Sequence, residues 1–565
     1  MAHFYAKCID CGHEAPYTAT SVSCQNCGSE WRETVYDFEK LKENFPERIK
    51  NRPFGLWRYK ELLPVNNPNL DLTLGEGGTP LLKASNLGLM LGIPHLYMKD
   101  ERQGPTTSFK DRQAAVTIAA LREAGVQEAV IASTGNVAIS YSAYAARAGI
   151  KLWAFITSLV PPVKMREVAL YGTQVVKVTG NYDEAKQIAA EFARERALYV
   201  DKGVRSITTV DAMKTITLEV SEQLTEILGP PDTTRDGVPE TSIYRAPDWY
   251  IQSVSGGMGP VGVLKGYSEL HTMGLVDKTP KIANLQAAGC APMVHAWKEG
   301  KTVADPVRTP RTHIATLATG DPGRTYTLLR ERMLAASGGT FEAVTDEEAF
   351  KAMHILAKME GVSVEPATAV AFAGLIKMVR EGQIKSTDVV VINITGHTIP
   401  VEQEVIGDNW ATDVEFPLEG IDQAMPAEDG LLAALNRVTD DRYPRVAIVD
   451  DHPHVRLLIR RILQAQGKYE LFEAEDGRSA LKLIRGEKPD LVILDLMMPE
   501  LDGFSVLDAL RSDPATASIP VIVVTAQELT TKEKQRLEGQ IQSLMQKGDF
   551  VSEELLDEVR SLIKE

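Results

Sequence analysis

The sequence predicts an α/β protein with parallel sheets, made of several folding units in one chain. Between residue 95 and about residue 400, apolar runs of strand length alternate with helical stretches, which is the pattern of repeated strand–helix units. A second set of such runs begins near residue 444 and includes 445–450, 490–496 and 520–526. At about 100–200 residues per domain, a chain of 565 residues accommodates roughly three or four units.

Composition and charge narrow the functional classes. Hydrophobic residues make up 44% of the chain and charged residues 24%, which is ordinary for a globular protein. The formal net charge of -16 argues against non-specific binding to nucleic acid or to an anionic membrane. No signal-peptide pattern is visible, and the apolar runs are much shorter than the roughly 20 residues of a membrane helix. We therefore expect a cytoplasmic protein with neither nucleic-acid nor membrane partners.

Residues 1–36 form a short cysteine module. Cys8 and Cys11 make one Cys-x-x-Cys pair, Cys24 and Cys27 make a second, and twelve residues separate the two pairs. Four thiolates are the ligand set of a structural Zn²⁺ and leave no open position for catalysis. We expect a zinc-ribbon-like module, and two redox pairs or a module that has lost its metal are the alternatives.

Two polar stretches break the strand–helix pattern. Residues 228–248 are rich in Pro, Asp and Thr and read as a surface loop. Residues 407–443 are acidic and polar and read as a linker with one short helix at 429–437. The predicted domains are therefore a large α/β domain at 50–406 and a C-terminal domain at 444–565.

The first two candidate chemical segments surround a lysine and an asparagine. Lys110 lies in GPTTSFKDR (104–112), and a lysine amine can bind a carbonyl cofactor covalently if a shaped pocket keeps it neutral. The turn in ASTGNVAIS (132–140) follows a strand and opens a helix, so it offers backbone N–H groups and the amide of Asn136. A lone lysine beside an aromatic residue is usually a surface charge. The hypothesis of a cofactor site therefore depends also on two further segments.

The other two segments are a glycine-rich turn and a strand end. VSGGMGP (254–260) follows a strand, and its glycines let the backbone approach a phosphate at a helix N-terminus. NITGHT (393–398) ends a buried strand with Thr395, a neutral hydrogen-bonding group.

In this order and spacing, the four segments resemble the fold type II pyridoxal-phosphate (PLP) enzymes, and within them the threonine synthase family. LWRYKELLP (56–64), LGEGGTPLL (74–82) and YMKDERQGPTTSFKDR (97–112) are similar to that family's N-terminal signature, and TGHT (395–398) is similar to its C-terminal one. The resemblance covers roughly residues 1–405. It implies a two-domain catalytic body, PLP as cofactor, a small amino-acid substrate and a homodimer.

The resemblance also implies roles by position. Lys110 would form the internal aldimine with PLP and then move protons between substrate carbons. Asn136 would bond the cofactor's phenolic oxygen, and Thr395 would bond its pyridine nitrogen and keep that nitrogen unprotonated. Ser133 and Thr134 would bind the substrate's α-carboxylate. The cofactor phosphate would lie in a loop formed by Ser255, Gly256, Gly257, Met258 and Gly259. In this family O-phosphohomoserine loses phosphate, water adds at the β-carbon, and threonine results.

Three departures from the family pattern bear on the substrate. Thr107 stands where the family has glycine, and Val137 follows Asn136 where threonine is common. The stretch 201–215 replaces the Asn-Ser-x-Asn-Pro and Gly-Gln-Lys-Thr elements that help to hold the substrate phosphate. The remaining cations that could bind an anion are Lys164, Arg166 and Lys214, although a single cation of this kind is more often a solvated surface charge. A related PLP lyase or β-replacement enzyme stays open, as does a PLP-fold sensor or scaffold in a two-component pathway.

In the last domain, polar residues follow three strand-like runs. Asp450 and Asp451 end the first run, Asp495 the second and Thr525 the third, and Lys547 follows a fourth. The carboxyl ends of strands in an open parallel sheet share one crevice. Carboxylates gathered there need a cation, and Mg²⁺ binds carboxylate oxygens and stabilises a transferring phosphoryl group.

This pattern resembles the response-regulator receiver domain, which has a doubly wound, flavodoxin-like fold. The resemblance implies that Asp495 accepts a phosphoryl group and that Asp450, Asp451 and Asp495 hold Mg²⁺. It further implies that Thr525 and Lys547 support the phosphoryl oxygens, and that a histidine kinase or a phosphotransfer protein is the donor. The leading hypothesis is a threonine synthase-like enzyme whose activity is regulated by phosphorylation.

Overall fold

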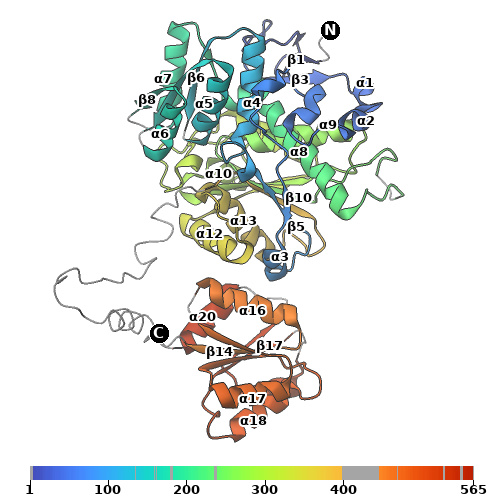
Figure 1. The fold of residues 1–565 in the computed structure, drawn as a ribbon, viewed down its shortest axis with the longest axis vertical. Coiled ribbons are helices and arrows are strands. Elements are labelled where there is room, and N and C mark those ends of the chain that lie inside the picture. Colours follow the sequence, from blue (N-terminus) through green and yellow to red (C-terminus); the bar gives the residue numbers. More distant parts are fainter. Residues whose placement is uncertain are drawn as a thin grey trace, which may run out of the picture. The chain divides into compact units, whose positions relative to one another are not determined.

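The described residues form three sheets in the N-terminal part and one sheet in the C-terminal part (Figure 1). The structure is a computed structural model, and it describes residues 4–133, 135–157, 160, 162–178, 182–234, 238–397, 444–466, 469–525, 529–546 and 552–563. The predicted linker at 407–443, with its helix at 429–437, lies outside the described residues. None of the helices in those ranges is long and apolar enough to cross a lipid bilayer.

The cysteine module is a three-stranded antiparallel sheet of order β2-β1-β3. Its strands are β1 (Phe4–Cys8), β2 (Glu14–Ala15) and β3 (Arg32–Tyr36), and the short helices α1 (Phe38–Lys42) and α2 (Phe45–Lys50) follow them. Buried and half-buried residues alternate along β1, as expected for a sheet with one covered face. Phe4 and Tyr36 pack against Leu270, so the module shares a core with the catalytic body.

A smaller parallel sheet has the order β8-β7-β6-β9. Its strands are β6 (Glu128–Ser133), β7 (Lys151–Thr157), β8 (Gln174–Val178) and β9 (Tyr199–Val200). The helices in this part of the chain are α4 (Lys110–Glu123), α5 (Asn136–Ala148), α6 (Pro162–Leu170) and α7 (Tyr182–Glu195). Apolar residues of α4 and α5 form one core with β6 and β7, and alanines of α7 pack into a second.

A larger sheet has the order β12-β11-β10-β13-β5-β4 and is parallel except for the edge strand β4. Its strands are β4 (Leu81–Lys83), β5 (Leu96–Asp100), β10 (Trp249–Ser253), β11 (Lys281–Ala287), β12 (Gly339–Val344) and β13 (Val390–Ile394). The remaining α-helices are α3 (Ser85–Leu91), α8 (Ile207–Leu228), α9 (Met258–Thr272), α10 (Pro292–Lys298), α11 (Arg324–Ala335), α12 (Asp346–Glu360) and α13 (Pro366–Arg380). Every residue of β5, β10 and β13 is buried, as expected for strands covered on both faces.

The C-terminal sheet has the order β15-β14-β16-β17-β18, which is the doubly wound flavodoxin-like order. Its strands are β14 (Arg445–Val449), β15 (Glu470–Ala474), β16 (Leu491–Leu494), β17 (Val521–Thr525) and β18 (Ser543–Gln546). The helices α16 (Pro453–Gln466) and α20 (Ser552–Leu562) cover one face, and α17 (Gly477–Glu487) and α18 (Gly503–Ser512) cover the other (Figure 1). The helix α19 (Thr531–Leu537) completes this domain. The predicted α/β fold class is therefore confirmed for both parts of the chain.

Candidate active site

Lys110 is the first residue of α4. Its side chain lines a cavity between the smaller and the larger parallel sheet. Its Nζ lies 4.1 Å from the centroid of the Phe109 ring and 3.7 Å from Sδ of Met258. Burial lowers the pKa of the Lys110 amine to about 8, although the Glu365 and Asp201 carboxylates oppose this shift. A lysine poised to lose its proton near neutral pH is suited to covalent chemistry with a carbonyl cofactor.

Asn136 begins α5 and faces the same cavity. Its Oδ1 accepts a hydrogen bond from Nζ of Lys164 at 3.2 Å, and its Nδ2 donates to Oε2 of Glu365 at 2.8 Å. The structure thus brings Lys164, a predicted candidate for anion binding, next to the predicted cofactor ligand. The second proton of the same amide remains for the predicted hydrogen bond to the cofactor.

The glycine-rich turn links β10 to α9 and lines the cavity from the other side. Gly257 has a φ of 82°, and an added Cβ would lie 2.7 Å from Thr325, so both conformation and space require glycine there. Gly256 has open space where a Cβ would point. No side chain caps the first N–H groups of α9, which suits them to an anionic group.

Thr395 follows β13 and is almost completely buried. Its Oγ1 donates to Oε1 of Glu365 at 3.0 Å and lies 2.7 Å from Oγ1 of Thr368. Among the predicted cofactor residues, Lys110, Asn136, Thr395 and the whole loop 255–259 line this one cavity. Their roles toward the cofactor remain predictions.

Of the two residues predicted to bind the substrate's α-carboxylate, only Ser133 is among the described residues. Ser133 is buried, and its Oγ accepts hydrogen bonds from the backbone N–H groups of Gly135 and Ala138, each at 3.0 Å. The side chain therefore caps the start of α5 and does not line the cavity. Thr134 lies outside the described residues, so substrate binding by this turn stays a prediction.

A wider cleft of about 560 Å³ adjoins the cofactor cavity and shares Val137, Tyr182, Gly256, Met258 and Thr319 with it. Four cationic side chains line this cleft: Lys186, Lys202, Arg205 and Arg324. The cysteine module reaches the same cleft, because Glu30 pairs with Lys202 and Arg205, and Asp10 pairs with Arg324. Cations and carboxylates therefore line this cleft together, and carboxylates of the N-terminal module pair with three of the four cations.

A fully buried ionic cluster lies behind Lys110. Arg112, two residues further along α4, bonds Glu101 at 2.8 Å and Glu219 at 2.7 Å, and Lys99 bonds the same Glu219 at 2.7 Å. Burial opposes ionisation of Glu219, but Arg112 and Lys99 outweigh it and hold the pKa of that carboxyl at about 2. The cluster joins β5, α4 and α8, and so it fixes the helix that carries Lys110.

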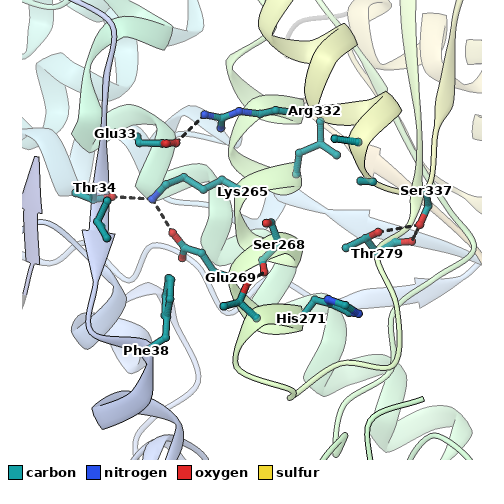
Figure 2. Close-up of a pocket in the computed structure, with 15 residues that line it drawn as sticks. Glu33, Thr34, Phe38, Lys265, Ser268, Glu269, His271, Thr279, Arg332 and Ser337 are labelled. Atoms are coloured by element: carbon teal, nitrogen blue, oxygen red, sulfur yellow. Dashed lines mark hydrogen bonds and ion pairs between the residues drawn. The ribbon is translucent and has the colours of Figure 1, made fainter. Parts of the chain in front are cut away.

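Lys214, expected either at the surface or as an anion partner, is instead completely buried. It pairs with Glu269 at 2.9 Å and with Asp211 at 3.4 Å, in a second ionic cluster between α8 and α9. Figure 2 shows the edge of this cluster, where Lys265 reaches Thr34 of the cysteine module and Glu269 of its own helix. A cavity of about 630 Å³ opens beside it, away from the residues predicted to bind the cofactor.

The four cysteines of the module come together. Sγ of Cys8 lies 3.6 Å from Sγ of Cys27, Sγ of Cys11 lies 3.7 Å from Sγ of Cys24, and all four sulfur atoms are within 4.8 Å of one another. Sulfur atoms held tetrahedrally at about 2.3 Å from one ion would be about 3.8 Å apart. The arrangement thus fits a structural Zn²⁺.

In the C-terminal domain, Asp450 follows β14, Asp495 follows β16 and Thr525 ends β17, and all three are buried. Carboxylate oxygens of Asp450 and Asp451 lie within 4.8 Å of each other and of a His452 ring nitrogen, which is compatible with a cation. Lys547 lies outside the described residues. The described part of the predicted phosphorylation site is thus gathered at one sheet edge.

The comparisons with known proteins match both parts of the chain. A family described as "Pyridoxal-phosphate dependent enzyme" matches residues 72–396, and one described as "Response regulator receiver domain" matches residues 446–560. Threonine synthase of Methanocaldococcus jannaschii is 34% identical over 393 residues, which are 69% of this chain and 91% of that protein. The threonine synthase of Methanosarcina acetivorans is 32% identical over 404 residues, 71% of this chain and 94% of that protein.

Among solved structures, diaminopropionate ammonia lyase from Escherichia coli, in complex with D-serine, has the same fold. It superposes with a TM-score of 0.50 at 16% identity and covers 60% of this chain and 89% of its own. The predicted class, a PLP-dependent lyase, is confirmed by the family and its threonine synthase relatives. The chain therefore belongs to the pyridoxal-phosphate dependent enzyme family, and a response regulator receiver domain follows its catalytic part.

Proposed function

We propose that the protein is a threonine synthase, which converts O-phosphohomoserine and water to threonine and inorganic phosphate. The observation that carries the proposal is the cavity in which Lys110, with a pKa of about 8, faces Asn136, Thr395 and the glycine-rich turn. The relatives that match nearly their whole length are threonine synthases, which supports this reaction over other PLP chemistry.

The residues fit PLP as cofactor, because no side chain caps the N-terminus of α9, which suits a phosphate, and the Lys110 amine lies against the Phe109 ring and Sδ of Met258. PLP supplies an electron sink next to the substrate's α-carbon when it is bound. Lys110 would hold the cofactor covalently and would carry protons between the substrate carbons. The Ser133–Thr134 turn orients the substrate's α-carboxylate at the start of α5.

The substrate phosphate needs cations, because the family's Asn-Ser-x-Asn-Pro stretch is absent. Lys164 is suited to this task, since its ammonium group lies beside Asn136 and within 3.9 Å of the position of a Cβ on Gly135. Lys202 and Arg205 of the adjoining cleft are further candidates. Lys214 is excluded from this role by its buried ion pairs.

The test is an assay of phosphate release and threonine formation from O-phosphohomoserine by the purified full chain. Equal amounts of both products, lost in Lys110→Ala, are expected. Lys164→Met should raise KM with less effect on kcat, because it removes substrate-binding charge. Lys151→Met, which changes an exposed lysine of β7, is the matched control and should leave KM unchanged. A PLP-loaded protein that forms neither product would refute the proposal and favour another amino-acid substrate or a sensor.

The receiver domain is proposed to regulate this enzyme through phosphorylation of Asp495 with Mg²⁺ at Asp450 and Asp451, and a histidine kinase or phosphotransfer protein would be the donor. A small phosphodonor should add one phosphoryl group to the wild type and none to Asp495→Asn, and it should change the turnover of the wild type only. Equal turnover before and after phosphorylation would remove the regulatory role.

A further inference from the structure

A histidine lies beside the two aspartates that follow β14 in the C-terminal domain. His452 comes directly after Asp450 and Asp451, and its ring nitrogen Nδ1 lies 2.5 Å from Oδ1 of Asp451 and 3.9 Å from Oδ1 of Asp450. One such atom from each of the three side chains lies within 4.8 Å of the other two. A cation bound here would therefore meet a nitrogen donor as well as oxygen donors.

The backbone holds His452 in this place. Its N–H group donates to Oδ1 of Asp450 at 2.9 Å, and its carbonyl accepts from the N–H groups of Val455 and Arg456 at 3.0 and 3.2 Å. Pro453 is the first residue of α16, and the residue before a proline is kept out of the helical conformation. The start of the helix therefore fixes the backbone of His452 next to the Asp450 carboxylate.

The distances between the three side chains suit a shared cation. In an octahedral site with metal–ligand distances of about 2.1 Å, neighbouring donor atoms lie about 3.0 Å apart and opposite ones about 4.2 Å. Nδ1 of His452 would have to move away from Asp451 by about half an ångström to fit this geometry. The His452 side chain is 70% exposed, so the ring has room for that movement and can carry its proton on Nε2.

The type of donor atom decides which ion is preferred. Mg²⁺ binds oxygen donors and keeps several of its waters, so it gains little from an imidazole nitrogen. Divalent transition-metal ions bind imidazole more strongly, and histidine is their commonest protein ligand. Mn²⁺ suits a mixed set of this kind, because it accepts carboxylate and water oxygens as Mg²⁺ does and binds nitrogen more strongly than Mg²⁺ does.

We propose that His452 is a ligand of the receiver domain's cation through Nδ1, and that the site therefore prefers Mn²⁺ to Mg²⁺. This inference rests on the proposed phosphorylation site, because it takes a divalent cation to bind at Asp450 and Asp451. It adds a nitrogen ligand to the predicted carboxylates. It also names the class of ion, a divalent transition metal, with which Asp495 would be phosphorylated.

The first test is electron spin-echo spectroscopy of Mn²⁺ bound to the full-length protein, which is supplied beforehand with one equivalent of Zn²⁺ for its cysteine module. A coordinated imidazole couples its ¹⁴N nucleus to the Mn²⁺ electron spin, so the wild type should show modulation from one directly bound nitrogen. His452→Phe keeps a ring of similar size and should lose the modulation. His454→Phe is the matched control, because His454 is an exposed histidine in the first turn of α16, and it should keep the modulation.

The same variants compare the two ions in binding titrations. Mn²⁺ binding is followed by loss of the free-ion EPR signal, and Mg²⁺ binding by its competition with Mn²⁺. His452→Phe should weaken Mn²⁺ binding by about tenfold or more, since even groups outside the ligand shell contribute that much to metal affinity. The Mg²⁺ affinity should change much less, because a water can take the place of the ring.

Binding of Mn²⁺ that is lost in Asp450→Asn but shows no ¹⁴N coupling in the wild type would overturn the inference and leave the proposed phosphorylation site intact. Equal losses of Mn²⁺ and Mg²⁺ affinity in His452→Phe would overturn it as well, because the ring would then serve only to order the loop. A protein that binds neither ion in this domain and takes no phosphoryl group at Asp495 would refute the proposed phosphorylation site and this inference with it.

Discussion

Thr107 has a left-handed backbone, and replacing it with glycine should stabilise the protein. Its φ is 57°, in a region that β-branched residues rarely adopt, and the related family has glycine at this position. The conformation is held from both sides, since the Thr107 N–H donates to the Gly104 carbonyl at 3.0 Å and the Thr107 carbonyl accepts from the His397 N–H at 3.1 Å. The turn leads directly into Lys110, so it is maintained despite its strain.

The magnitude follows from two opposing effects. A non-glycine residue in this region costs about 1–3 kcal/mol, which Thr107→Gly removes. Glycine also gains freedom in the unfolded chain, which costs about 0.4–1 kcal/mol. The variant should therefore be more stable by about 1 kcal/mol. Thr302→Gly is the control, because Thr302 is exposed, its φ is not positive, and only the unfavourable effect applies.

Urea unfolding of the cofactor-free protein, followed by tryptophan emission, measures the difference. The six tryptophans all precede residue 411, so the emission reports the catalytic part and is silent about 444–565. Thr107→Gly should shift the midpoint to higher urea, and Thr302→Gly should shift it to lower urea. An equal loss of stability in both variants would show that the left-handed turn is not strained and would refute the predicted stabilisation by Thr107→Gly.

Three further perturbations test the buried charges and the metal site. Glu219→Gln should lower the free energy of unfolding by about 3–5 kcal/mol in the same urea assay, because Lys99 and Arg112 would lose their shared partner. An unchanged midpoint would contradict the stabilising role of this ionic cluster. Burial lowers the pKa of Lys110 from 10.5 to about 8, so between pH 8 and pH 10.5 the unfolded chain binds more protons than the folded one. The stability of the wild type relative to Lys110→Met should therefore rise with pH over this range. A pH-independent difference would refute that shift. Cys24→Ser should abolish binding of one Zn²⁺ per chain, as measured by elemental analysis, and a wild type that binds no Zn²⁺ would favour redox pairs.

Much of the fold could be predicted because buried parallel strands are continuous apolar runs. The runs near 96–100, 249–253 and 390–394 all became fully buried strands. The strand β12 (Gly339–Val344) was missed, because it starts with glycine and contains Glu342. The two-residue strand β9 is too short to leave any pattern in the sequence.

The candidate site was predicted in part. Lys110, Asn136 and Thr395 were singled out from motifs far apart in the chain, and the structure brings them to one cavity. Glu365 was missed, because a glutamate before proline at a helix start looks like ordinary dipole compensation. Its side chain bonds Asn136 and Thr395, which lie more than 25 residues before and after it in the chain. No local sequence pattern relates residues so far apart.

Lys214 was misjudged for a related physical reason. A lysine is rarely buried without a partner, so a lysine in a polar stretch was taken as solvated or as free to bind an anion. Asp211, three residues earlier on the same helix face, was the available signal for an ion pair. The second partner, Glu269, comes from α9 and could be found only in the folded structure.

The cysteine module and the catalytic cleft are physically coupled through charge. Glu30, three residues after the last cysteine, holds Lys202 and Arg205, and Asp10, between the first two cysteines, holds Arg324. The proposed anionic substrate would compete with these carboxylates for the same cations if it entered this cleft. Asp10 and Glu30 lie within and beside the two Cys-x-x-Cys knuckles, so loss of the predicted Zn²⁺ should free the cations as well as loosen the module. The module therefore contributes to the electrostatics of the cleft that adjoins the cofactor cavity.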